Sequence, residues 1–125
     1  MPHKTSWEKF GLCWTFYGVV SLQEVHDADG EMYSAPQFDE LKYFIWDGSK
    51  IEKIDYDIDE ADQPAAIDKA SSQYKPYLKG ALIGEDEKVR LVIKRYIETS
   101  SKLNSSWELK LFSNLFEARQ WLGYQ

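Results

Sequence analysis

The stretch LKYFIW, residues 41–46, decides the fold class of this chain of 125 residues. It is apolar at nearly every position, which is typical of a central strand whose sheet is covered by helices on both faces. A second stretch of this kind, LKGALI at residues 78–83, ends at Gly84. Apolar residues recur at helical spacing between the two stretches, up to Gln73. The sequence therefore predicts a strand–helix–strand unit with parallel strands and a right-handed crossover.

The connecting helix has two candidate starts. Pro64 is best placed in the first turn of a helix, which puts the start near Asp62. Asp57 together with Glu60 offers an earlier start. Both starts remain open from the sequence alone.

The residues before this unit predict a hairpin and a helix. Ser6–Phe10 and Leu12–Tyr17 favour two strands that meet around Gly11. Ser21-Leu22-Gln23-Glu24 is a capping box, in which the serine and the glutamate each satisfy a free backbone N–H group. The helix that it opens must end before Pro36, because the residue before a proline avoids helical angles. Its apolar face is interrupted by an aspartate, and the members named for this face are Leu22, Val25, Met32 and Tyr33, with Asp29 as the interruption.

The residues after the unit predict a helix, a strand and a last helix. Glu85–Lys102 has acids in its first turn and one apolar stripe, as expected of an amphipathic helix. Trp107–Phe112 alternates as a strand does. Ser113 is the predicted cap of the last helix, which ends near Gly123.

These elements follow the order β-β-α-β-α-β-α-β-α, with about four helices. No linker or low-complexity segment interrupts residues 1–125, so the sequence predicts a single α/β domain. The βαβαβ core requires parallel strands, and the N-terminal hairpin adds an antiparallel pair, so the sheet is predicted to be mixed.

Composition and charge limit the classes of molecule that this chain is expected to bind. The net charge of −6 and the pI near 4.9 disfavour nucleic acid and anionic membranes as partners. Cys13 is the only cysteine, so an internal disulfide is excluded, and a small buried side chain is its expected role. The sequence has no signal-peptide pattern and no apolar run near the ~20 residues that span a bilayer. We therefore expect a cytoplasmic protein without membrane insertion.

The acidic stretch FIWDGSKIEKIDYDID, residues 44–59, is the first candidate for chemistry. Asp55, Asp57 and Asp59 match the opening acids of an EF-hand calcium loop, but Glu60 and Ala66 stand where that loop needs glycine and a bidentate glutamate. Zinc-ligand spacing is also absent, since the only histidines are His3, expected near a mobile terminus, and His26 in the first helix. The sequence predicts no metal and no cofactor.

A hydrolase site is the second candidate. Ser49 follows the first buried strand, and His26 is the only plausible base for it. The G-x-S-x-G turn of α/β hydrolases is absent, and so is a glycine-rich phosphate loop, because Gly80 and Gly84 are not followed by Gly-Lys-Ser/Thr.

The order of elements resembles the SpoIIAA-like fold of STAS domains (sulfate transporter and anti-sigma-factor antagonist). The strings that carry the resemblance are LKYFIWDGSKIEKID, LKGALIG and WELKLFSNLFEARQWL, and it covers the chain from about Trp7 to Leu122. Small stand-alone bacterial proteins of unknown role are the most similar members. Lipid-binding domains of the Sec14 type share the fold, which implies that a small ligand is possible.

The resemblance also implies a regulatory switch. In anti-sigma-factor antagonists a serine after the corresponding strand accepts a phosphate, and that region falls near Asp55-Tyr56-Asp57 here. No serine or threonine stands there, and a dianionic phosphate beside these acids would be repelled. The chain departs from the switch pattern at this point.

Three functional hypotheses follow. The leading one is a non-enzymatic module that binds another protein, or a second copy of itself as a homodimer, through the carboxyl ends of its strands. The second is a carrier of a small apolar or anionic ligand held between the sheet and a helix. The third is a serine hydrolase that uses Ser49. Ligands of open α/β sheets favour the carboxyl ends of strands, so the predicted surface consists of Asp47, Ser49, Asp55, Tyr56, Asp57 and Gly84.

Overall fold

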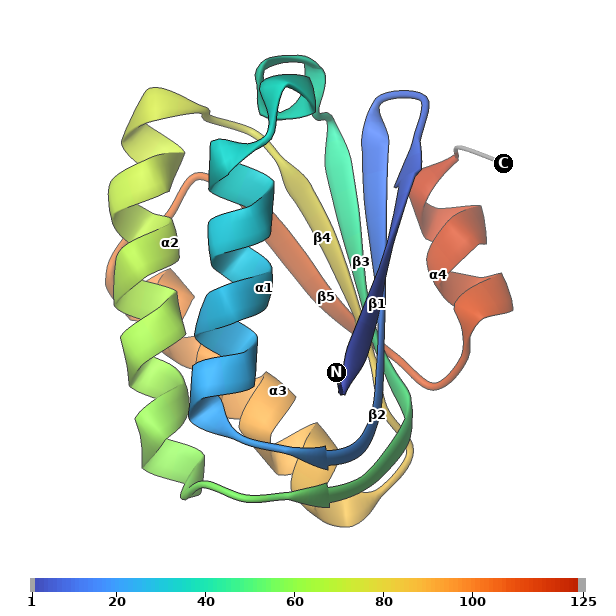
Figure 1. Ribbon diagram of the computed structural model, residues 1–125. Helices are drawn as coiled ribbons and strands as arrows, with labels where there is room; N and C mark the ends of the chain where they lie inside the picture. Colours follow the sequence, from blue (N-terminus) through green and yellow to red (C-terminus); the bar gives the residue numbers. More distant parts are fainter. Residues whose placement is uncertain (1, 124–125) are drawn as a thin grey trace.

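The computed structural model describes residues 2–123 and contains one five-stranded mixed sheet (Figure 1). The strands lie side by side in the order β1-β2-β3-β4-β5. The first pair is antiparallel and the other three pairs are parallel. The strands are β1 (His3–Glu8), β2 (Gly11–Val20), β3 (Tyr43–Ile54), β4 (Lys79–Ile83) and β5 (Glu108–Phe112).

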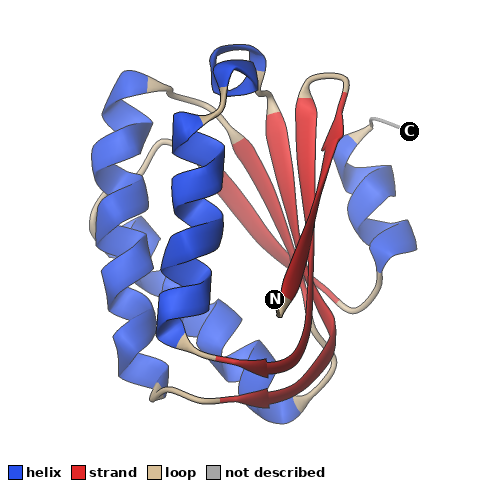
Figure 2. Ribbon diagram, in the orientation of Figure 1, coloured by secondary structure: helices blue, strands red, loops and turns tan. Residues whose placement is uncertain are grey.

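Helices cover both faces of this sheet (Figures 1 and 2). Three of them pack on one face and the short C-terminal helix packs on the other. They are α1 (Leu22–Ser34), α2 (Asp62–Tyr74), α3 (Glu87–Lys102) and α4 (Leu115–Leu122), with the 3₁₀ helices η1 (Pro36–Glu40) and η2 (Ile58–Ala61). The predicted α/β class, the mixed sheet and the element order β-β-α-β-α-β-α-β-α are confirmed.

The sheet separates two apolar cores, as the side chains of β2 show. Leu12, Trp14 and Phe16 point toward the layer of α1, α2 and α3, and all are buried. Cys13 points to the opposite face and packs in the smaller core under α4. Successive side chains of a strand point to opposite faces, so this alternation fixes which helices cover which side. The cavity described below lies in the larger core.

The predicted hairpin forms, but its turn lies before Gly11. Lys9 and Phe10 make the turn, with Phe10 at φ 64°, and Gly11 is already the first residue of β2. A Cβ atom on Gly11 would come within 2.0 Å of the Tyr43 ring. This glycine is therefore needed for close packing rather than for the turn.

Strand β3 is longer than the predicted strand at residues 41–46, because the chain stays extended through Gly48-Ser49. The strand continues to Ile54 through two irregularities in its pairing with β2. At the first of these, the register advances from Thr15↔Asp47 to Tyr17↔Lys50, and the Asp47 carboxylate accepts a hydrogen bond from the Ser49 N–H at 3.0 Å. An extra residue in one strand is a β-bulge, which bends that strand and shifts its side-chain alternation.

The two register shifts also explain why the second half of β3 is not evident from the sequence. Phe44 and Trp46 alternate normally into the larger core, but the next members are Ile51 and Ile54. Ile51 lies five residues after Trp46, and Ile54 lies three residues after Ile51. Each of these intervals contains one register shift, so the inward-facing residues no longer recur at every second position. A periodicity analysis therefore ends the strand too early.

The start of α2 agrees with one of the two candidate positions, whereas the cap of the last helix differs from the prediction. A 3₁₀ turn, η2, follows Asp57, and α2 itself begins at Asp62, so each of the two candidate starts marks the start of one helical segment. The last helix is capped by Asn114 and not by Ser113, because the Asn114 side chain accepts from the Glu117 N–H at 2.9 Å. Its end at Gly123, with φ 79°, is as predicted.

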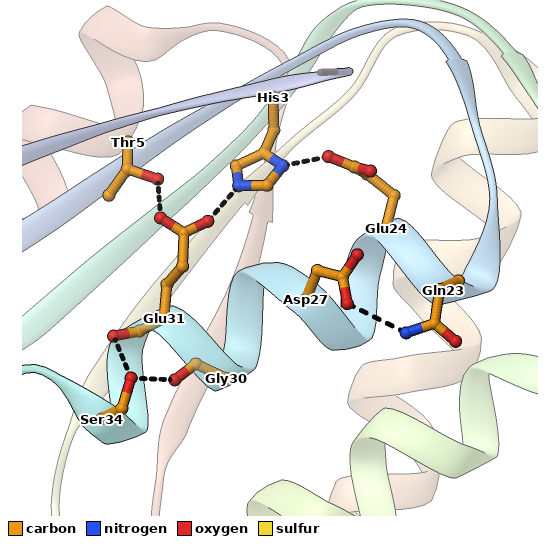
Figure 3. Close-up of polar contacts among 8 residues, drawn as sticks. All are labelled: His3, Thr5, Gln23, Glu24, Asp27, Gly30, Glu31 and Ser34. Atoms are coloured by element: carbon orange, nitrogen blue, oxygen red, sulfur yellow. Dashed lines mark hydrogen bonds and ion pairs between the residues drawn. The ribbon is translucent and has the colours of Figure 1, made fainter.

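His3 is buried in β1, which corrects the expectation of a mobile residue (Figure 3). Its imidazole lies between two carboxylates of α1, with Nδ1 on Glu24 and Nε2 on Glu31. Thr5 also donates to Glu31, at 2.9 Å. The Ser21 oxygen accepts from the Glu24 N–H at 3.2 Å, but the Glu24 side chain contacts His3 instead of completing the capping box. These contacts attach α1 to the first strand.

Replacing His3 by glutamine should destabilise the protein in a pH-dependent way. Burial lowers the pKa of His3, but the hydrogen bonds to Glu31 and Glu24 outweigh it, so the pKa lies above the ordinary value of 6.5. A raised histidine pKa stabilises the fold fully below about 6.5 and ceases to do so as pH rises through the folded-state pKa. We expect a loss of about 1–3 kcal/mol at about pH 6 that shrinks at about pH 9. Urea unfolding of both proteins at the two pH values measures it, and a loss that grows with pH would contradict it.

Candidate functional site

A cavity of about 40 Å³ lies between the sheet and the layer of α1, α2 and α3. Such a volume holds a few water molecules or a small chemical group. Its walls come from two strands, three helices and the segment after β3. The lining residues are Val25, Asp29, Trp46, Tyr56, Ala61, Pro64, Asp68, Leu82, Val92, Ile93 and Tyr96.

Most of the wall is apolar for reasons visible in the sequence. Trp46 of β3 and Leu82 of β4 both face the larger core. Val92, Ile93 and Tyr96 belong to the apolar stripe of α3, which recurs at helical spacing and faces the sheet. The strands and α3 therefore supply a mainly apolar surface.

Two carboxyl groups interrupt that surface. Asp29 of α1 is 9% exposed and Asp68 of α2 is 5% exposed. The two carboxyl groups are near enough to influence each other's charge, and two tyrosine hydroxyls, Tyr33 of α1 and Tyr96 of α3, each donate to Asp68. Three helices thus meet at Asp68.

One proton shared by the two aspartates accounts for this arrangement. Burial, followed by the neighbouring Asp68 charge, raises the pKa of Asp29 well above its ordinary value. Burial also raises the pKa of Asp68, while the hydrogen bonds from Tyr33, Tyr96 and Asp29 oppose that rise. Donors stabilise the ionised form, so Asp68 carries the negative charge and Asp29 carries the proton.

One polar atom of the pair has no protein partner. Asp29 Oδ2 is buried and has no hydrogen bond from any of residues 2–123. A buried carbonyl oxygen without a donor is uncommon in folded proteins, because it loses its water without a replacement. Burial also raises the pKa of Tyr96, followed by the effect of the Asp68 charge, so this tyrosine remains a hydrogen-bond donor. The cavity therefore contains one negative charge and one open acceptor oxygen.

The six residues predicted for the functional surface do not form one site. Tyr56 lines the cavity, and burial raises the pKa of its hydroxyl. Asp47 is buried in β3, and Gly84 is buried directly after the end of β4. Ser49, Asp55 and Asp57 are exposed to solvent outside the cavity.

The residues considered for catalysis and metal binding also have defined places. His26 is partly exposed and its ring contacts Gln63 at 3.4 Å, and no hydrogen bond joins it to Ser49 in the described chain. Burial raises the pKa of the Cys13 thiol to about 11. Within residues 2–123, no three or more histidine, cysteine, aspartate or glutamate side chains are grouped to hold a metal ion.

The sequence expectations miss the residues that make the cavity polar. They include Asp29 only as an interruption of an apolar face, and they assign no site to Asp68, Tyr33 or Tyr96. A signal is present, because Asp29 and Tyr33 are four residues apart on α1, and Asp68 follows the buried Pro64 by four residues on α2. Acids placed within apolar helix faces are expected to be buried.

No protein-family model, curated protein or solved structure matches this chain. Within residues 2–123, none of the helices combines the length and the apolar character needed to cross a bilayer.

Proposed function

We propose that this chain is a small-ligand-binding domain whose ligand enters the cavity at Asp29 and Asp68. The observation that carries the proposal is the buried Asp29 Oδ2 atom, which belongs to a residue of the cavity wall and has no donor among residues 2–123. Burying a carboxyl group without full pairing costs stability. A ligand that donates a hydrogen bond to this oxygen would offset that cost.

The lining favours binding over covalent chemistry. It contains no serine, cysteine, lysine or histidine, and the hydrogen bonds from Tyr33 and Tyr96 engage the Asp68 carboxylate and lower its basicity. The buried Asp68 charge also disfavours an anionic ligand, because like charges repel strongly where water is excluded. The ligands expected from the sequence are apolar or anionic, and the Asp68 charge disfavours the anionic ones. The cavity therefore favours a ligand whose head group is uncharged or donates hydrogen bonds.

Titration of ¹⁵N-labelled protein with small neutral, cationic and anionic probes at about 1–10 mM tests the proposal. We expect at least one probe class to shift the amide signals of cavity residues in a saturable way. Ala61→Leu and Val92→Ile fill the cavity and should abolish the response, whereas Ala66→Leu, on the exposed side of α2, should retain it. Native mass spectrometry of gently purified protein provides a second readout through a stoichiometric adduct. Equal responses in the filled variants, or no response to any class, would refute ligand binding in the cavity.

Protein binding at the carboxyl end of the sheet is the second candidate. Asp55 and Asp57 are exposed there, and neither takes part in an ion pair with residues 2–123. Unpaired surface acids favour a basic partner through electrostatic complementarity. The double variant Asp55→Lys/Asp57→Lys should lose a co-purifying protein that the wild type retains, and unchanged capture would count against this surface.

A SpoIIAA-like assignment remains part of the proposal. It is supported by the antiparallel first strand, the three following parallel pairings and the sequential strand order. The absence of a serine or threonine at residues 55–57 argues against the phosphorylation switch of the anti-sigma-factor antagonists.

A further inference from the structure

The polar side of the cavity presents acceptors and negative charge. Asp29 Oδ2 is open, and Asp68 holds its charge among donors that are already used. No lysine, arginine or histidine lines the cavity to neutralise that charge. A neutral or anionic group placed here would leave the charge of Asp68 without a counterion.

We propose that the cavity binds the head group of a small primary ammonium compound, with an ammonium N–H donating to Asp29 Oδ2 and the positive charge facing Asp68. This inference rests on the proposed function and specifies its ligand class. A monocation would bring the singly charged pair to neutrality. The ammonium group would also supply the donor that Asp29 Oδ2 lacks among residues 2–123.

The remaining walls suit such a group. Trp46, Tyr56 and Tyr96 place three aromatic side chains around the cavity. The electron-rich faces of aromatic rings attract cations, and the attraction is stronger where water is excluded. The cavity volume of about 40 Å³ fits a head group with a short apolar chain and not a large metabolite.

Binding should weaken as the solution becomes acidic. A second proton on the pair removes the charge that faces the ammonium group. The titratable groups around it are Asp29, Tyr33 and His26 from α1, Asp68 from α2, Tyr96 from α3, and Tyr56 with the nearby Glu60 from the segment after β3. Burial, followed by the Glu60 charge, raises the pKa of Tyr56. Burial raises the pKa of Asp68, and a positive charge on His26 opposes that rise.

Four probes of similar size separate the contributions. Propylammonium carries charge and N–H donors, tetramethylammonium carries charge alone, 1-propanol carries a donor alone, and propionate carries the opposite charge. We expect propylammonium to shift the cavity amide signals with at least about tenfold higher affinity than the other three probes. Its affinity should fall at least about tenfold in Asp68→Asn, which removes the charge, and in Asp29→Leu, which removes the acceptor. Asp27→Asn, an exposed acid on the same helix, should bind as the wild type does.

Each outcome decides the ligand class separately from the proposed function. Stronger binding of 1-propanol or propionate would overturn the ammonium assignment and leave ligand binding in the cavity intact. Equal binding of tetramethylammonium would overturn the hydrogen bond to Asp29. Absence of binding by all four probes, together with a response to larger probes of another class, would overturn the inference alone. Circular dichroism and thermal melting of each variant confirm that a lost response does not come from unfolding.

Discussion

Asp68→Ala is expected to lower the free energy of unfolding by roughly 2–4 kcal/mol. The reason is that Tyr33 and Tyr96 both donate to this carboxylate from different helices, so both hydroxyls lose their acceptor in a buried setting. Asp68→Asn keeps the size and one acceptor oxygen, and should lose less. Urea unfolding at neutral pH measures both, with Asp57→Ala as the exposed control that should change little.

The partner aspartate should respond in the opposite direction. In the variant Asp29→Asn, the side-chain amide would donate to Asp68 as a protonated carboxyl group does, without having to hold a proton. Because the pKa of Asp29 is raised in the fold, the wild type loses stability as pH rises from about 3.8 toward the folded-state pKa. We expect Asp29→Asn to raise stability by about 1 kcal/mol at neutral pH, and by less in acid. If Asp29→Asn and Asp68→Asn destabilise the protein equally, the assignment of the proton to Asp29 is wrong.

Gly80→Val is expected to cause the other large loss, about 3 kcal/mol or more. Gly80 lies in β4, between two neighbouring strands, and a Cβ atom there would come within 2.4 Å of the Phe44 ring and 2.7 Å of Leu109 Cδ2. The Phe44 ring is buried and packs against the rings of Trp14 and Trp107, so it has no free space to move into. Thermal unfolding should show a markedly lower midpoint or a protein that fails to fold.

Gly30→Ala provides the matched control for this substitution. Gly30 lies inside α1, and no atom lies within 4 Å of the position that its Cβ atom would take. Alanine is favoured over glycine in a helix by about 1 kcal/mol, so this variant should be more stable than the wild type. A destabilised Gly30→Ala, or a Gly80→Val as stable as the wild type, would contradict the packing described here.

The strands and the main helices are predictable because their periodicity is simple. LKYFIW and LKGALI form central strands, and the stripe of residues 89–97 faces the core on α3. The second half of β3 is not predictable, because two register shifts remove the alternation that marks a strand. The sequence places Gly11 in a turn since glycine is common there, although its position is fixed by the ring of Tyr43, which is distant in sequence.

The candidate site is less accessible from the sequence than the fold. Asp29, Asp68 and Tyr96 come from three helices, and only the tertiary packing brings them together. The dense acids of residues 55–59 stand out because they are close together in sequence, but Asp55 and Asp57 are solvent-exposed. Within this short stretch, only Tyr56 lines the cavity.

The bulges of β3 also determine where this chain can change in length. Ile51 and Ile54 reach the larger core only because each register shift adds one position relative to β2. Loss of one residue between Asp47 and Lys50 would remove the first bulge and leave Ile51 facing the larger core, because regular alternation from Trp46 then places it inward. Single-residue deletions in a descendant sequence should therefore be tolerated at these two bulges, as should single-residue changes of length in the turn at Lys9-Phe10.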